Sequence, residues 1–362
     1  MESNTKNALK KIEVELNKIK NKTFRVMFFV YDTKGAPSGS LSYIYEIAYQ
    51  LKELGYNVQM IHAENEFIGV ESWLGEKYSS LPHFHIKDDN VHASPADILF
   101  IPELYANVMS QTKSMPCKRV VILQNFTYAT EIIPAGVSWD DLKIRECLTT
   151  SDILGKRLSS YFPDVQMRIV RPSIQKEFKC EKKPKQLVIN LVAKDWKDIN
   201  NIVKPFYWKY PIYAWVTFRP IINATREDFA KASQESFATI WCDSDTDFGY
   251  SAIEAMSAGN ILIGKVPENE NEWMYKDGNL RNNGVWFYAS KDAIDLVAGI
   301  VQSFLLDNIP DSIFEEMKDT VETYTIEKQI EDIKENIVNG IFAQREQELE
   351  ISYNAFKKKE KE

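Results

Sequence analysis

The sequence predicts an α/β fold with two consecutive domains, each organised around a doubly wound parallel sheet. Its 362 residues suit two domains of ordinary size, and a hydrophobic content of 44% is enough for two cores. Short apolar runs typical of buried strands alternate with helical patterns, as in β–α–β units. Residues 171–185 hold two prolines and five lysines and separate two such series. We therefore expect a first domain over 23–170, a linker over 171–185 and a second domain over 186–310.

The first domain begins with a β–loop–α–β unit. The apolar run from Arg25 to Tyr31 predicts a strand, and a glycine-containing loop leads into a helix over 41–54 that Gly55 ends. A second strand is expected at 58–61. Further strands are expected at 98–101, at 120–123, around Leu148 and at 168–170.

The second domain repeats the alternation. Its apolar runs predict strands at 187–192, 212–218, 238–242, 261–263 and 285–288. Helical patterns fall at 199–207, 226–234 and 251–257. The aromatic residues of 206–215 straddle a predicted helix end and strand, so we interpret them as packing residues and not as a platform for stacking sugars.

Both ends of the chain predict helices outside the two sheets. Residues 1–22 form a charged amphipathic pattern, with Leu9, Ile12, Leu16 and Ile19 at spacings of three and four. Residues 311–362 are almost entirely helical by pattern. These two charged terminal segments are candidate contact surfaces for a protein partner or for a second copy of the chain.

Composition limits the possible partners and compartments. The net charge of −8 provides no global basic field for nucleic acid or anionic lipid. The four cysteines (Cys117, Cys147, Cys180 and Cys242) lack paired spacing, which is typical of buried thiols in a reducing compartment. The N-terminus is polar, and no apolar run approaches about 18 residues. We therefore expect a cytoplasmic protein without a transmembrane segment.

The window from Asp247 to Gly259 is the most informative motif. Phe248 and Gly249 predict a tight turn, residues 251–257 predict a short helix, and Gly259 predicts its end. The amino end of such a helix attracts phosphate groups, because its first N–H groups have no partner within the helix. Glu254, one turn further, can accept hydrogen bonds from ribose hydroxyls.

This window resembles the donor-site motif of retaining glycosyltransferases with the GT-B fold, in particular the large family four. The shared pattern is a carboxylate, then Phe-Gly, then Glu-Ala-Met and a glycine. The resemblance implies two Rossmann-like domains that face a cleft, with the last helices crossing back to the first domain. It also implies transfer of a sugar from a nucleotide-diphosphate sugar to an acceptor hydroxyl, with retention of configuration and with neither a metal nor another cofactor.

The resemblance assigns roles around the motif. Glu254 would hold the ribose, and the turn and helix start formed by Phe248, Gly249, Tyr250 and Ser251 would bind the diphosphate. The first glutamate of the family falls at Thr246, which Asp245 and Asp247 flank, so Thr246 and Asp247 are the candidates beside the donor sugar. The family's cationic pair that grips the diphosphate corresponds most closely to Lys194 and Lys197, although a lysine replaces the usual arginine.

Candidate residues in the first domain follow from their position after predicted strands, at the sheet edge where ligands bind in such folds. The resemblance places the loop of Gly35 and Gly39 toward the cleft, where Gly39 would meet donor phosphate and Gly35 the acceptor. Gln124 and Asn125 follow one strand, and their amides could contact sugar hydroxyls, Gln124 at the reaction centre and Asn125 at the acceptor. Glu103 follows another strand and could bind the acceptor. A capped turn at Asn125 and a helix N-terminal acid at Glu103 are equally compatible interpretations.

Other functions remain open at this stage. A non-catalytic GT-B binding or partner subunit is the main alternative, because Thr246 lacks the carboxylate. A glycosyltransferase that acts on a modified nucleic-acid base is a further alternative, which the negative charge disfavours. The acidic segment 243–254 lacks the glycine that a calcium loop requires at its sixth position. The four histidines (His62, His83, His85 and His92) have no acid or cysteine at zinc-ligand spacing.

Overall fold

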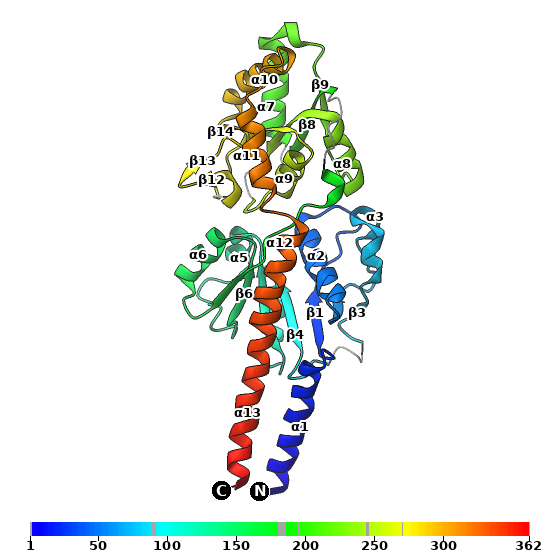
Figure 1. Cartoon of the computed structure of the whole chain (residues 1–362), viewed down its shortest axis with the longest axis vertical. Helices are drawn as coiled ribbons and strands as arrows, with labels where there is room; N and C mark the ends of the chain where they lie inside the picture. Colours follow the sequence, from blue (N-terminus) through cyan, green and yellow to red (C-terminus); the bar gives the residue numbers. More distant parts are fainter. Residues whose placement is uncertain are drawn as a thin grey trace. The chain divides into compact units, whose positions relative to one another are not determined.

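We describe the protein from a computed structural model, which covers residues 2–88, 92–179, 186–194, 196–243, 246–269 and 271–361. The chain forms two compact units (Figure 1). The first unit contains residues 1–171 and 329–362, and the second contains residues 172–328. The chain therefore leaves the first unit after Arg171 and returns to it at Gln329.

The first unit is built on a parallel sheet of seven strands in the order β3-β2-β1-β4-β5-β6-β7. The strands are β1 (Arg25–Phe29), β2 (Asn57–His62), β3 (His83–His85), β4 (Ile98–Pro102), β5 (Lys118–Leu123), β6 (Glu146–Thr149) and β7 (Gln166–Ile169). The connecting helices are α2 (Gly39–Glu53), α3 (Glu71–Leu74), η1 (Glu76–Ser80), α4 (Ala106–Gln111), α5 (Phe126–Ile132) and α6 (Asp152–Tyr161). The central strands are buried on both faces, so they have continuous apolar runs and not an alternating pattern.

Local sequence explains where α2 begins and ends. Ser38 caps its amino end by accepting a hydrogen bond from the N–H of Leu41, and Gly55 follows its last residues with a φ of 84°. Between β1 and β4, the rings of Phe28 and Phe100 stack with centroids 4.7 Å apart. These contacts fix the first β–α–β unit that the sequence predicts.

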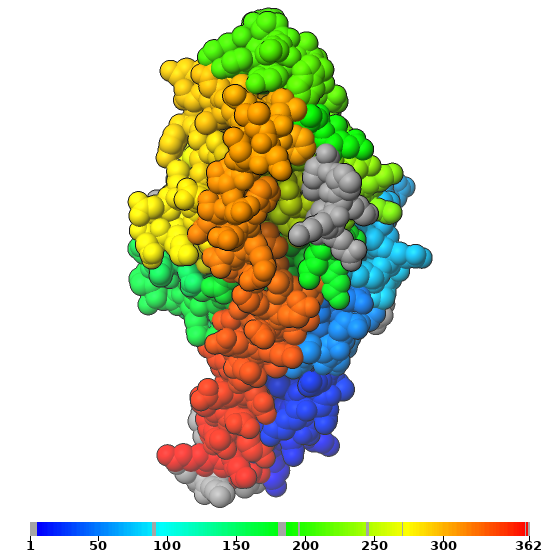
Figure 2. Space-filling view, turned by 45° about the horizontal axis from the view of Figure 1, so that its top comes forward, coloured from blue at the N-terminus to red at the C-terminus, as the bar shows by residue number. Residues whose placement is uncertain are grey.

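The two ends of the chain form an antiparallel helix pair that belongs to the first unit. Helix α1 (Glu2–Lys20) lies beside α13 (Ala343–Lys361), as Figures 1 and 2 show in blue and red. Leu9, Leu16 and Ile19 of α1 are buried, as their spacing predicts. Helix α13 continues a single long helical segment that begins with α12 (Ile326–Asp332) and passes through the π-helical η6 (Ile333–Phe342).

The second unit contains a five-stranded parallel sheet in the order β14-β11-β10-β8-β9 and a small antiparallel pair, β12 with β13. The strands are β8 (Gln186–Ala193), β9 (Thr217–Pro220), β10 (Ser236–Cys242), β11 (Ile261–Lys265), β12 (Tyr275–Lys276), β13 (Asn279–Leu280) and β14 (Val285–Phe287). The helices are η3 (Lys176–Phe178), α7 (Trp196–Lys209), η4 (Pro211–Tyr213), α8 (Arg226–Glu235), α9 (Tyr250–Ser257), η5 (Glu272–Met274), α10 (Ser290–Leu305) and α11 (Asp311–Val321).

The predicted fold class is confirmed: two α/β units each contain a parallel sheet, and helices extend from both ends of the chain. The predicted strand at 212–218 is wrong. Pro211 starts a 3-10 turn, and the strand begins only at Thr217. Ile212 and Trp215 are exposed in this turn, so their apolar character does not mark a buried strand.

The structure describes only the first part of the segment predicted as a linker. Residues 172–179 belong to the second unit, where Ile174 and Phe178 are buried in the core that also contains Phe229 and Trp241. The N–H of Ile174 donates to the carbonyl of Tyr324 at 2.8 Å. Residues 180–185, which include Cys180, lie outside the described residues.

A buried polar network fixes the amino edge of the second sheet. Asn260, just before β11, accepts hydrogen bonds from the hydroxyls of Ser236 at 2.7 Å and Thr239 at 2.8 Å. Its amide nitrogen donates to the carbonyls of Ser233 and Ser236. Asn190 of β8 donates to the Ser236 hydroxyl at 2.7 Å. The network therefore ties the end of α8 to the starts of β10 and β11, and no motif in the sequence indicates it.

We predict that Asn260→Ala destabilises the second unit by about 3 kcal/mol, because four hydrogen bonds are lost and their buried partners stay unsatisfied. Urea unfolding followed by tryptophan fluorescence measures the change. Asn308→Ala, at an exposed position after α10, is the matched control and is expected to change stability little. Equal effects of the two substitutions would contradict a structural role for the network.

Candidate functional site

The predicted donor residues gather at the carboxyl edge of the second sheet. β8 ends beside Lys194, β10 ends beside Asp243 and β11 ends at Lys265. These three strands are neighbours in the sheet and run parallel, so the side chains that follow them share one edge. The turn at 246–249 and the start of α9 follow β10 at this same edge.

The turn before α9 depends on backbone geometry that glycine favours. Gly249 has φ = 73°, in the left-handed region, and it occupies the N-cap position of α9. A Cβ atom built on Gly249 would lie 2.6 Å from Cζ2 of Trp241. The hydroxyl of Thr246 accepts the N–H of Gly249 at 2.9 Å, and the indole of Trp273 donates to the carbonyl of Phe248. The turn is thus fixed from both sides.

Helix α9 begins and ends close to the predicted positions. Tyr250 and Ser251 form its first turn, where helical N–H groups lack partners within the helix. Glu254 lies one turn further and is half-buried. At the other end Gly259 has φ = 77° and its N–H donates to Met256, which closes the helix as predicted.

Three lysines provide positive charge at this edge. Nζ of Lys194 lies 3.3 Å from a carboxylate oxygen of Asp243, and the Lys194 side chain is 57% exposed. Lys197 is exposed in the first turn of α7. Lys265, which no motif in the sequence marks, ends β11. The neighbouring Asp195 and Asp245 lie outside the described residues.

Asp198 forms an ion pair with Lys265, the least exposed of these lysines. Its carboxylate accepts hydrogen bonds from Nζ of Lys265 at 2.6 Å and from the hydroxyl of Ser290 at 2.7 Å. Partial burial opposes ionisation of Asp198, but the hydrogen bonds from Lys265 and Ser290 and the positive charge of Lys265 outweigh it and lower the pKa. Only the fold brings these residues together, because they come from α7, β11 and α10.

In the first unit, the predicted glycine loop is held by an aspartate. Gly35 has φ = 81°, and no atom lies within 4 Å of a Cβ built on it. Asp32 accepts the N–H of Lys34 at 2.8 Å and that of Ile68 at 3.1 Å, which fixes the loop against residues after β2. Gly39 is exposed as the first residue of α2. Both glycines therefore lie at the carboxyl edge of the first sheet.

Glu103, Gln124 and Asn125 meet at that same edge. The carboxylate of Glu103 is buried and accepts the backbone N–H groups of Gln124 at 3.0 Å and Asn125 at 2.9 Å. The Asn125 side chain caps α5 by accepting the N–H of Tyr128. The amide of Gln124 donates to the hydroxyl of Ser40 at 2.8 Å. These side chains build the sheet edge, and their roles toward sugars stay predictions.

The structure thus assembles the predicted residues as two groups. Thr246 to Ser251, Glu254, Lys194 and Lys197 share the carboxyl edge of the second sheet. Gly35, Gly39, Glu103, Gln124 and Asn125 share the carboxyl edge of the first. Within the described part of the chain, no cluster of three or more histidine, cysteine or acidic side chains could hold a metal ion.

Three of the histidines nevertheless lie together at the ends of β2 and β3. The ring centroids of His62 and His85 are 5.8 Å apart, and the ring of Phe67 stacks on His62. Their nitrogens contact nearby chain groups: His62 contacts the carbonyl of Glu64, and His83 contacts the hydroxyl of Tyr45 at 2.8 Å. Burial lowers the pKa of His83. The cluster is a packed part of the sheet edge.

Solved structures share this fold. A pneumococcal O-GlcNAc transferase, GtfA, solved with UDP and GlcNAc, matches with a TM-score of 0.65 over 88% of this chain and 99% of its own, at 11% identity. A glycosyltransferase from Rickettsia africae matches with a TM-score of 0.61 over 89% and 98%, at 14% identity. The fold matches that of GT-B glycosyltransferases.

A third solved structure shares the fold. HepE of Anabaena, solved with UDP-glucose, matches with a TM-score of 0.58 over 87% of this chain and 99% of its own, at 10% identity. No family model matches the chain, and no curated protein matches it. In the described ranges, no helix is long and apolar enough to cross a membrane.

We predict that Gly249→Ala destabilises the second unit by about 3 kcal/mol, because a Cβ must avoid Trp241 and the backbone must keep a left-handed conformation. Gly278→Ala is the matched control. Gly278 has a similar φ of 78° but open space around its Cβ, so we expect a cost of about 1 kcal/mol. Chemical denaturation of both variants separates the packing effect from the backbone effect, and equal costs would rule out the packing effect.

We predict that Asp198→Asn destabilises the second unit by about 1 kcal/mol at neutral pH and not at all in acid. The folded pKa of Asp198 lies below its unfolded value of about 3.9. Its contribution is therefore complete above pH ~4 and is lost as the pH falls through the folded pKa. Unfolding curves at several pH values test this, with the exposed Asp292→Asn as control. A difference between wild type and Asp198→Asn that does not change with pH would contradict it.

Proposed function

We propose that the protein is a glycosyltransferase that moves a sugar from a nucleotide-diphosphate sugar to an acceptor hydroxyl, with retention of configuration and without a metal. The observation that carries the proposal is the left-handed turn at Gly249, which opens α9 at the sheet edge that also holds Lys194, Lys197 and Lys265. Helix N-terminal amides and lysine ammonium groups both bind diphosphate. The solved structures with UDP or UDP-glucose share the fold and support this choice.

The proposed mechanism relies on positioning and charge. The N–H groups of Tyr250 and Ser251 and the ammonium groups of Lys194 and Lys197 stabilise the negative charge that develops on the leaving diphosphate. Glu254 accepts hydrogen bonds from the ribose hydroxyls and sets the position of the donor along α9. The acceptor hydroxyl attacks the anomeric carbon on the face from which the diphosphate leaves, and the departing phosphate oxygen takes its proton. Thr246 and Asp247 lie beside the sugar.

A non-catalytic nucleotide-binding protein is the second candidate, and one contact favours it. The hydroxyl of Thr246 accepts the N–H groups of Phe248 and Gly249, so this side chain serves the turn. The carboxylate that the family places at this position is absent. Slow hydrolysis of the donor distinguishes the candidates, because an enzyme releases nucleotide from its own donor and a binding protein does not.

We predict that one of UDP, GDP, ADP and CDP raises the melting temperature of the protein, with or without EDTA. A ligand that binds only the native state stabilises it by mass action. Glu254→Ala should weaken the affinity for that nucleotide about tenfold or more, because a charge-assisted hydrogen bond to the ribose is lost. Thermal shift and calorimetric titration measure both effects.

The exposed Glu227→Ala in the first turn of α8 is the matched control, and it should leave nucleotide binding unchanged. If none of the four nucleotides shifts the melting temperature, the nucleotide site itself is wrong. If a nucleotide binds and neither donor hydrolysis nor sugar transfer follows with any donor, the non-catalytic candidate is favoured. Loss of binding on addition of EDTA would contradict the metal-independent mechanism.

A further inference from the structure

The terminal helix pair α1/α13 extends from the amino edge of the first sheet, the edge opposite the candidate site residues of that unit. β1, β4 and β5 all begin at this edge, and the two helices run away from it side by side (Figures 1 and 2). Both chain ends therefore lie at the far end of the pair, which we call the tip and define as residues 2–11 and 352–361. The tip is remote from the edge where Glu103 and Gln124 lie.

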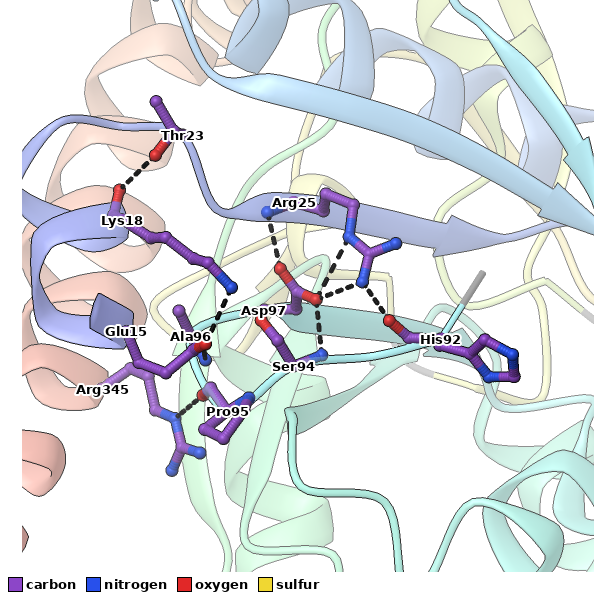
Figure 3. A network of polar contacts seen from close by, with 10 residues as sticks. All are labelled: Glu15, Lys18, Thr23, Arg25, His92, Ser94, Pro95, Ala96, Asp97 and Arg345. Atoms are coloured by element: carbon purple, nitrogen blue, oxygen red, sulfur yellow. Dashed lines mark hydrogen bonds and ion pairs between the residues drawn. The ribbon is translucent and has the colours of Figure 1, made fainter. Parts of the chain in front are cut away.

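The base of the helix pair is fixed to the sheet by a polar network (Figure 3). Glu15 of α1 accepts the N–H of Ala96 at 3.0 Å, and Arg345 of α13 donates to the carbonyl of Pro95 at 2.7 Å. The buried Asp97 in the same loop pairs with Arg25 at the start of β1. One short loop therefore holds both helices and the first strand together.

A second set of contacts anchors α13. Nζ of Lys118, at the start of β5, lies 2.8 Å from Glu348 and 3.4 Å from the buried Glu146. Arg345 also donates to the carbonyl of Pro116 at 2.7 Å. These paired charges explain the polar residues in the inner half of the pair. They do not explain the residues of the tip, which lie beyond every one of these contacts.

The charge of the tip is opposite to that of the chain. Its two segments contain seven lysines and two glutamates, whereas the whole chain has a net charge of −8. Lys6, Lys10 and Lys11 are exposed on α1, and Lys357 and Lys358 are exposed on α13. At 100° per residue, Lys6 and Lys10 share one side of α1, and Lys11 lies 100° from Lys10. Lys357 and Lys358 lie 100° apart on α13, so positive charge occupies more than one side of the tip. Phe356, next to two of the lysines, is 37% exposed.

We propose that the tip docks on a membrane surface that contains anionic lipids. Lysine ammonium groups are attracted to anionic headgroups, and each one near the surface adds to the affinity. An aromatic residue among the lysines can enter the boundary between headgroups and acyl chains, which a binding site for nucleic-acid phosphates does not require. Docking through the tip attaches the first unit by its amino edge and leaves the carboxyl edge of the sheet uncovered.

Other occupants fit the tip less well. A second copy of the chain would need a continuous apolar face, but the exposed apolar residues Val14, Ile351 and Phe356 are spread along the pair. At 100° per residue, Ile351 and Phe356 lie on different sides of α13. An anionic bilayer needs only the positive charge and an exposed aromatic side chain such as Phe356.

The test is co-sedimentation of the full chain with vesicles of phosphatidylcholine, with and without phosphatidylglycerol. We expect binding only to the anionic vesicles, weaker at high salt. The tip variant Lys10→Glu, Lys11→Glu, Lys357→Glu, Lys358→Glu should bind at least about tenfold more weakly. The matched control carries the same four charge reversals at Lys156, Lys204, Lys231 and Lys334, which are exposed elsewhere, and it should retain binding.

Further measurements keep the outcomes separate. Phe356→Ala should reduce vesicle binding several-fold without changing the melting temperature. Absence of vesicle binding, or equal losses in the tip and control variants, would overturn the proposal. So would tip-dependent dimers in sedimentation velocity, or tip-dependent binding to duplex DNA in place of vesicles. Nucleotide binding by the tip variant should match that of the wild type, so this proposal and the proposed function can fail independently.

Discussion

The left-handed backbone of Gly249 is the constraint on which the candidate nucleotide site depends. It turns the chain at the end of β10 so that α9 starts at the sheet edge, and the ring of Trp241 beneath it leaves no space for a Cβ. Trp273 holds the preceding carbonyl and Thr246 holds the N–H of Gly249 itself. The amide groups that would bind a diphosphate are therefore positioned by packed aromatic side chains and by hydrogen bonds within the chain.

The sequence predicts most of what is local in this fold. The turn, α9 and its glycine end were predicted because each depends on residues within a few positions of one another. The error at 212–218 has the same origin, because exposed apolar residues in a turn after Pro211 look like a strand when burial is unknown. The contact of Asp198 with Lys265 and Ser290 could not be predicted, since it joins three elements that only the sheet order brings together.

The two edges of the first sheet differ in what their side chains contact. At the carboxyl edge, the side chains of Glu103 and Asn125 accept hydrogen bonds from backbone N–H groups. Ligand contacts at this edge would then come from loops such as that of Gly35. At the amino edge, the loop of Ala96 and Asp97 anchors both chain ends. The tip proposed to dock and the residues predicted to contact ligands lie at opposite edges of the sheet, so the two proposals do not require the same surface.

Thr246 connects the stability of the turn with the chemistry expected there. A glutamate at this position has a longer, charged side chain that can reach beyond the turn, whereas the threonine hydroxyl is used inside it. Of the two acids that flank Thr246, the described one is Asp247, and it is buried in the turn. A buried carboxylate is held firmly but is less able to follow a sugar through a reaction. The choice between enzyme and binding protein therefore depends on whether Asp247 can contact the donor from its fixed position.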